Sequence, residues 1–126
     1  MASVVLDVGA LIAIDRGDRR IGAALHVAGR EHVDVITSSA CVAQVASDRS
    51  PEGRLARALA GIVEHPLDAP AARRIGRLLA ESATADVAQA AAALLAGPAD
   101  VVLTGSPKEI RRLIGLAGTD ARVEGI

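Results

Sequence analysis

The residues most able to do chemistry lie in three short turns, each of which follows an expected β-strand. These turns are Asp7-Val8-Gly9, Thr37-Ser38-Ser39 and Thr104-Gly105-Ser106. The carboxyl ends of parallel strands open onto the crevice in which such sheets bind ligands, so side chains from the three turns are expected to face a ligand. Asp7 is the single carboxylate of these turns. It has two interpretations, as an acid of a binding site or as the cap of the helix expected to follow it.

The sequence gives little support for a histidine metal site, a disulfide, a serine nucleophile or a phosphate-binding loop. The histidines lack any metal-ligand spacing, and they are His26, His32 and His65. Cys41 is the single cysteine, so it forms no intramolecular disulfide, and we interpret it as a small buried apolar group. Ser106 has no histidine near it in the sequence to activate it as a nucleophile. No glycine-rich phosphate loop is present.

Length and composition predict one globular domain over residues 1–126. The chain is 51% hydrophobic with a formal net charge of −1, which argues against disorder and against a strongly basic DNA-coating protein. It contains no Phe, Trp or Tyr, so aromatic stacking on single-stranded nucleic acid is excluded. The first residues lack the basic segment of a signal peptide, and the longest apolar run, Ala90–Ala96, is too short to cross a bilayer. We therefore expect a cytoplasmic protein without a membrane segment.

Short β-branched runs alternate with longer stretches of helical period, which predicts an α/β domain with a mostly parallel sheet of four or five strands. The expected strands are Val4–Asp7, Val33–Ile36, Ile62–His65, Val101–Thr104 and Ala121–Glu124. The expected helices are Gly9–Arg16, Arg19–Ala28, Ser39–Ala46, Glu52–Ala60, Pro70–Glu81, Ala85–Ala96 and Pro107–Leu116.

Several of these helices carry start signals. Ser106-Pro107-Lys108-Glu109 has the pattern of a capping box with proline at the first helical position. Thr84 is placed to cap the helix expected from Ala85, and Thr37, Ser38 or Ser39 is placed to cap the helix that contains Cys41.

Two segments, taken together, resemble a known family. Val4-Val5-Leu6-Asp7-Val8-Gly9-Ala10-Leu11-Ile12-Ala13 resembles the first strand and turn of PIN-domain ribonucleases, which include the VapC toxins of toxin–antitoxin pairs. The segment from Asp86 to Ala96, followed by Val101-Val102-Leu103-Thr104-Gly105-Ser106-Pro107, resembles the second half of that family. The resemblance implies a three-layer α/β/α domain and a metal-dependent endoribonuclease.

PIN domains gather about four carboxylates around one or two Mg²⁺ or Mn²⁺ ions, which activate water against a phosphodiester. Asp7 matches the first acid of the family. Three neutral residues stand at the other acid positions: Gln44 at the second, Gln89 at the third, and Ser106 at the end of Thr104-Gly105-Ser106, where the family has Thr-x-Asp.

A second carboxylate, Asp86, lies three residues before Gln89 and therefore on the same helical face. A shift of the alignment by one turn makes Asp86 itself the third acid, and the choice between Asp86 and Gln89 stays open. The alternative role of Asp86 is structural, since a carboxylate is favoured in the first turn of any helix. Glu109 is placed to reach back from the third helical position. The resemblance thus assigns catalysis and metal binding to Asp7 and Asp86, at a site weakened or inactivated by the lost charges.

The resemblance also implies partners. Arg49, Arg54 and Lys108 lie near the crevice and are candidate contacts for RNA phosphates, while the remaining arginines are interpreted as solvated helix faces. An antitoxin protein and a second copy of the chain are the expected protein partners.

Three hypotheses follow. The first is an active metal-dependent endoribonuclease, and the second is a catalytically silent PIN-like module that binds a protein or RNA. The third, an unrelated Rossmann-like domain for a small molecule, lacks a phosphate loop.

Overall fold

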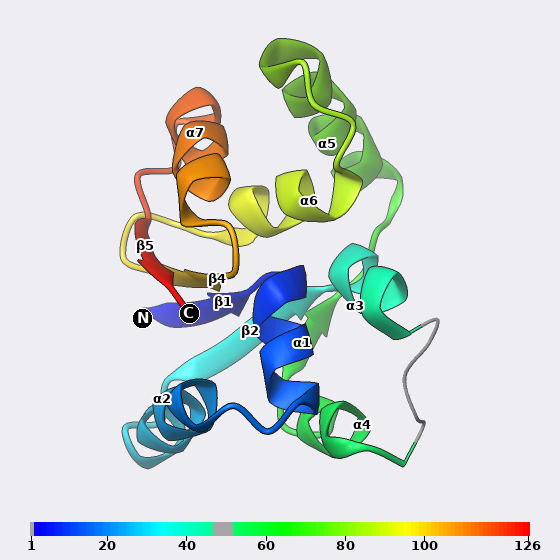
Figure 1. Ribbon diagram of the computed structural model, residues 1–126. Coiled ribbons are helices and arrows are strands. Elements are labelled where there is room, and N and C mark those ends of the chain that lie inside the picture. The colour runs from blue at the N-terminus through cyan, green and yellow to red at the C-terminus, as the bar shows by residue number, and fades with distance from the viewer. Residues whose placement is uncertain (1, 47–51) are drawn as a thin grey trace.

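The computed structural model describes residues 2–46 and 52–126, which form a parallel five-stranded sheet between two layers of helices (Figure 1). The strand order is β3-β2-β1-β4-β5. The strands are β1 (Ser3–Leu6), β2 (Asp34–Ser38), β3 (Val63–His65), β4 (Val101–Thr104) and β5 (Arg122–Gly125). The sequence-based prediction of a parallel α/β/α domain is confirmed.

Seven helices are found in the described part of the chain. They are α1 (Val8–Asp15), α2 (Arg19–Arg30), α3 (Ser39–Ala46), α4 (Arg54–Leu59), α5 (Ala69–Ser82), α6 (Val87–Leu95) and α7 (Pro107–Ala117). Figure 1 shows α1, α2 and α4 on one face of the sheet and α5, α6 and α7 on the other. Helix α3 lies beyond the carboxyl ends of the strands, where it contacts both α1 and α6.

The central strands are apolar because both of their faces are covered. Val5, Leu6 and Val102 are fully buried, as expected for parallel strands between two helical layers. Helix α6 is buried around almost its whole circumference, and its run of alanines lets it lie close to the sheet and to α3, α5 and α7. No single described helix has the length and apolarity to cross a membrane, although the sharply bent pair α5 and α6 together satisfies both criteria.

The sheet register brings the three sequence-predicted turns together. Leu6 lies opposite Thr37 of β2 on one side and opposite Leu103 of β4 on the other. The next residues along the three strands, Asp7, Ser38 and Thr104, therefore meet at one edge of the sheet.

Element boundaries agree with the predictions to within two residues, but the predicted cap of α6 is wrong. Helix α6 begins at Val87 rather than at Ala85, and its N-cap is Asp86. Thr84 does not cap the helix; its Oγ1 accepts from the Asp86 N–H, 3.3 Å away. The strand expected to end at Ile36 continues to Ser38, whose Oγ accepts from the Ala40 N–H at 3.1 Å and starts α3.

The capping box at the start of α7 is also absent, although the helix begins at Pro107 as predicted. The Ser106 side chain makes no cap hydrogen bond, and the Ser106 N–H donates to Thr104 Oγ1 at 2.8 Å. The Glu109 carboxylate instead takes two hydrogen bonds from Arg112, which lies one turn further along α7. An ion pair between residues three apart has displaced the reciprocal cap.

Candidate functional site

Asp7 occupies the centre of the sequence-predicted site, and it is sealed from solvent. Its side chain is 0% exposed. Oδ1 accepts from the Ala10 N–H at 3.0 Å and from the Gly105 N–H at 3.4 Å, and Oδ2 accepts from the Thr104 hydroxyl at 2.5 Å. Asp7 therefore caps α1 and at the same time ties it to β4 and to the turn before α7.

Two glycines close the turns over this carboxylate. A Cβ built on Gly9 would lie 2.7 Å from the main-chain N and Cα of Gly105, a distance that real side chains do not reach. A side chain at position 9 would therefore force the two turns apart, and one at position 105 would crowd the Gly9 Cα at 3.2 Å. Sequence reasoning missed this pair, although small residues in two turns that follow adjacent strands were a usable signal.

Burial changes the proton affinity of the site. Loss of solvent raises the pKa of Asp7 above the ordinary carboxyl value, and the hydrogen bonds from Thr104, Ala10 and Gly105 act in the opposite direction. Burial likewise raises the pKa of the nearby Cys41 thiol to about 12, with the Asp7 charge as a further cause. Cys41 is fully buried and donates its S–H to the Ala88 carbonyl oxygen, so its interpretation as a small core residue is confirmed.

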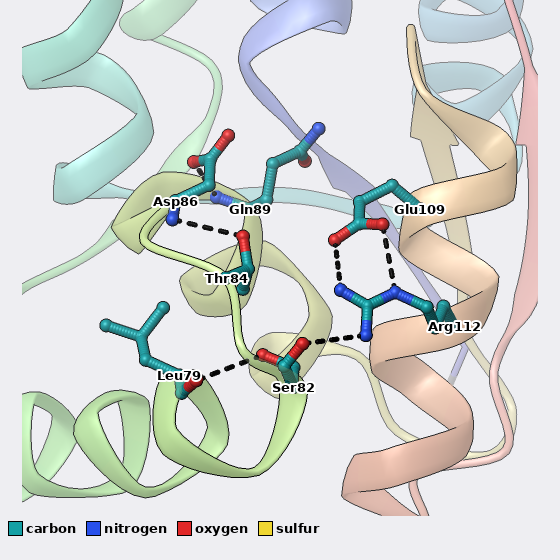
Figure 2. Close-up of polar contacts among 7 residues, drawn as sticks. All are labelled: Leu79, Ser82, Thr84, Asp86, Gln89, Glu109 and Arg112. Carbon is teal, nitrogen blue, oxygen red and sulfur yellow. Dashed lines mark hydrogen bonds and ion pairs between the residues drawn. The ribbon is translucent and has the colours of Figure 1, made fainter.

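Asp86 has a different environment. It is exposed, and its Oδ1 accepts from the Gln89 N–H at 3.0 Å, as an N-cap does. Figure 2 shows the Asp86 and Gln89 side chains on the same side of α6. Asp86 also lines an open groove of about 680 Å³ with Gln44 of α3, Leu67 and Val87. Asp86 and Gln44 are thus brought together as predicted, on a surface where Asp7 has no exposed atom.

The other predicted positions do not complete an acidic cluster. The Glu109 carboxylate is bound by Arg112, which also donates to the carbonyl oxygen of Ser82 at the end of α5 (Figure 2). Gln89 is 8% exposed, and its Oε1 is a buried acceptor without a hydrogen-bond donor among the described residues. Ser106 and Lys108 are exposed, and Thr104 is buried as the donor to Asp7.

The donor set does not fit a resident Mg²⁺ or Mn²⁺ ion. Asp7, which matches the first acid of the family, has both carboxylate oxygens engaged by internal donors, and the other candidate acid, Asp86, uses Oδ1 to cap α6. Within residues 2–46 and 52–126, no group of three or more His, Cys, Asp or Glu side chains is placed to hold a metal ion. Hard divalent cations need several anionic oxygens, and each carboxylate lost weakens their binding.

The predicted RNA contacts are dispersed. Arg54 lies on the α4 side of the molecule, where its guanidinium donates to the Asp15 carbonyl oxygen at 3.4 Å. Lys108 stands at the start of α7, in the opposite helical layer. The third residue, Arg49, lies outside the described residues.

Comparison with known proteins gives the fold. No protein-family model matches the chain, and no curated protein matches it either. Among solved structures, it is similar to a chain of VapBC2 from Rickettsia felis bound to a DNA fragment from their promoter, with a TM-score of 0.67 and 16% identity, covering 98% of both chains. It is also similar to a chain of DNA-bound VapBC from Salmonella typhimurium, with a TM-score of 0.63 and 22% identity, covering 99% of this chain and 98% of that one. These matches confirm the PIN-like fold along nearly the whole length.

Proposed function

We propose that this chain is a PIN-fold protein of the VapC-toxin type that acts by binding a partner protein and does not cleave RNA. The observation that carries the proposal is the state of Asp7. A carboxylate binds a metal ion through an oxygen that the ion can reach, whereas Asp7 is fully buried and accepts hydrogen bonds from three structural elements.

The neutral residues at positions 44, 89 and 106 fit the same conclusion. Carboxylates crowded together without a metal repel one another, so a protein that does not use the ion is stabilised when they are replaced by neutral groups. Gln89 lies buried where the family has an acid, and a carboxylate there would carry an unpaired charge into the core.

Partner binding is supported by the surface beside the former site. Leu67 and Val87 are 44% and 41% exposed, and they line the groove that contains Gln44 and Asp86. Exposed large apolar side chains that share one groove are typical of interaction surfaces. The similar solved structures are complexes named VapBC, which favours an antitoxin-like protein as the partner. A homodimer, an RNA ligand and a cytoplasmic location stay predictions.

The second candidate is a metal-dependent ribonuclease. One observation favours it: the exposed Asp86 carboxylate and the Gln44 side chain line the same open groove, so these two could contribute to a weak ion site.

RNA cleavage in the presence of Mn²⁺ separates the two candidates. The wild-type chain and a variant carrying Gln44→Glu, Gln89→Asp and Ser106→Asp are incubated with a labelled structured RNA, and folding of both is checked by circular dichroism. The proposal predicts no cleavage by the wild-type chain at any Mn²⁺ concentration. Cleavage by the wild-type chain that Asp86→Asn abolishes would establish the ribonuclease instead.

A further inference from the structure

A small cavity lies at the carboxyl ends of β2 and β3, on the face of the sheet that α5 and α6 cover (Figure 1). Ser38 of β2 and His65 of β3 are partners in the sheet register, so their side chains leave the same face of the sheet. Both line the cavity, and so does Arg74 of α5. Parallel sheets bind ligands at the carboxyl ends of their strands. The cavity is therefore a candidate ligand site, next to the groove of Asp86, with which it shares Leu67 as a wall.

Three hydrogen-bond donors at this cavity are available to a ligand. Within the described part of the chain, no hydrogen bond or ion pair engages the exposed side chains of Arg74 and His65. Ser38 is 4% exposed, and its Oγ accepts from the Ala40 N–H at 3.1 Å, while no described group accepts its hydroxyl proton. A guanidinium, an imidazole N–H and a hydroxyl together suit a ligand with a negatively charged acceptor.

The carboxylates nearest in the sequence do not neutralise these donors. Glu64 precedes His65 along β3 and therefore projects from the other face of the sheet, and its Oε2 accepts from the Ser39 hydroxyl at 2.6 Å. Asp68 caps α5 through Oδ1, which accepts from the Ala71 N–H at 2.9 Å. None of the described residues that line the cavity is acidic. The Arg74 guanidinium therefore brings an uncompensated positive charge to the cavity.

The rest of the cavity wall is apolar and leaves little space inside. Its side chains include Leu67, Ile75, Ala91, Leu94 and Leu95. The volume is about 40 Å³. One water needs about 10–15 Å³, so the space suits an apolar chain of roughly two or three carbons. Phosphate fits poorly, because its charged oxygens all need donors and an apolar wall supplies none. A carboxylate carries its charge at one end and an apolar tail at the other.

We propose that the cavity lined by Ser38, His65 and Arg74 binds a small monocarboxylate with a short aliphatic tail. The carboxylate accepts from Arg74 and from the two side chains at the strand ends, and the tail fills the space between α5 and α6. A free small molecule is favoured as the ligand because the volume admits little beyond such a tail.

NMR chemical-shift titration of the isotope-labelled chain tests the proposal with four defined probes. They are butyrate, butyramide, inorganic phosphate and a glutamate blocked at its main-chain amino and carboxyl groups. Butyrate is expected to saturate with a dissociation constant of about 1 mM and to shift the amides of residues that line the cavity. Butyramide has the shape without the charge, and phosphate has the charge without the tail, so both are expected to bind about tenfold more weakly or less tightly still.

Two matched pairs of variants locate the binding. Arg74→Gln removes the guanidinium and is expected to weaken butyrate about tenfold or more, whereas Arg73→Gln, at an exposed position of α5 outside the cavity wall, keeps the affinity. Ala71→Leu places a large side chain in the cavity and is expected to abolish binding, whereas Ala72→Leu, at the next and exposed position, keeps it. Thermal unfolding of the four variants checks that the fold is intact.

Several results would overturn the proposal. Butyrate and butyramide, or butyrate and phosphate, bind equally; Arg73→Gln and Arg74→Gln lose the same affinity; the shifted amides lie away from the cavity; or butyrate does not saturate at tens of millimolar. Tighter binding of the blocked glutamate than of butyrate would assign the cavity to an acidic side chain of a partner protein instead. These measurements involve neither RNA cleavage nor partner binding, so their outcome is independent of the proposed function.

Discussion

Asp7 and Asp86 are both aspartates that cap the N-terminus of a helix, but Asp7 is buried and Asp86 is exposed. Each is the N-cap of a helix and accepts a hydrogen bond at 3.0 Å from the N–H three residues later. Asp86 is exposed, and apart from Thr84 its hydrogen bonds stay within its own helix start. Asp7 is fully buried and joins α1, β4 and the turn before α7. A carboxylate at a strand end can therefore hold the fold together where the family resemblance assigns it to catalysis.

The largest expected effect is that of Asp7→Ala. It removes the cap of α1 and leaves the Thr104 hydroxyl and the Ala10 N–H buried without their acceptor. Unsatisfied buried donors cost about 1–3 kcal/mol each, so we expect a loss of roughly 3–5 kcal/mol in the free energy of unfolding, measured by urea titration. Asp7→Asn is the control, since it keeps the shape and the cap oxygen. A loss below 1 kcal/mol for Asp7→Ala would show that the hydrogen bonds of this carboxylate contribute little to the stability of the fold.

The next effect concerns the contact of Gly9 with Gly105. Gly9→Ala places a Cβ 2.7 Å from main-chain atoms, so the two turns must separate, and we expect a loss of about 2–3 kcal/mol. Gly105→Ala meets the Gly9 Cα at 3.2 Å and should cost less. Gly29→Ala on α2, where nothing lies within 4 Å, should stabilise by up to about 1 kcal/mol through helix propensity. The melting temperatures of the three variants are measured by thermal unfolding. Equal changes in all three would contradict the close contact of Gly9 with Gly105.

Asp86→Ala is expected to have a smaller effect of about 1 kcal/mol, because only the cap of α6 is lost and water can replace the acceptor. Urea titration beside Asp7→Ala makes the comparison direct. If the two alanine variants lose the same stability, burial does not distinguish the two carboxylates.

The smallest expected effect is the dependence of the free energy of unfolding on pH. Because burial raises the pKa of Asp7 in the folded chain, the folded state binds a proton more readily than the unfolded one. The contribution of Asp7 is therefore most favourable below its unfolded pKa and falls as pH rises through the folded pKa. The hydrogen bonds to the carboxylate offset part of this penalty, so the fall is expected to be modest. Unfolding curves of the wild-type chain and Asp7→Asn across this range should diverge with rising pH, and parallel curves would contradict the assignment.

The sequence predicts the fold better than the site. Apolar strands alternating with amphipathic helices set the five-stranded parallel sheet, and its register brings Asp7 and Thr104 together as expected. The sequence analysis did not predict the burial of Asp7, because this burial depends on the contact of Gly9 with Gly105, which are 96 positions apart in the sequence. The capping box failed for a local reason, since Arg112 competes for the Glu109 carboxylate.

Calorimetric titration of Mn²⁺ into the wild-type chain and into Asp7→Asn shows whether Asp7 is a metal ligand or a structural residue. Asp7 supplies no exposed oxygen, and the described residues contain no acidic cluster around it. We therefore expect no saturable binding up to millimolar Mn²⁺ in either protein. Micromolar binding to the wild-type chain that is lost in Asp7→Asn would contradict it and would make Asp7 a metal ligand.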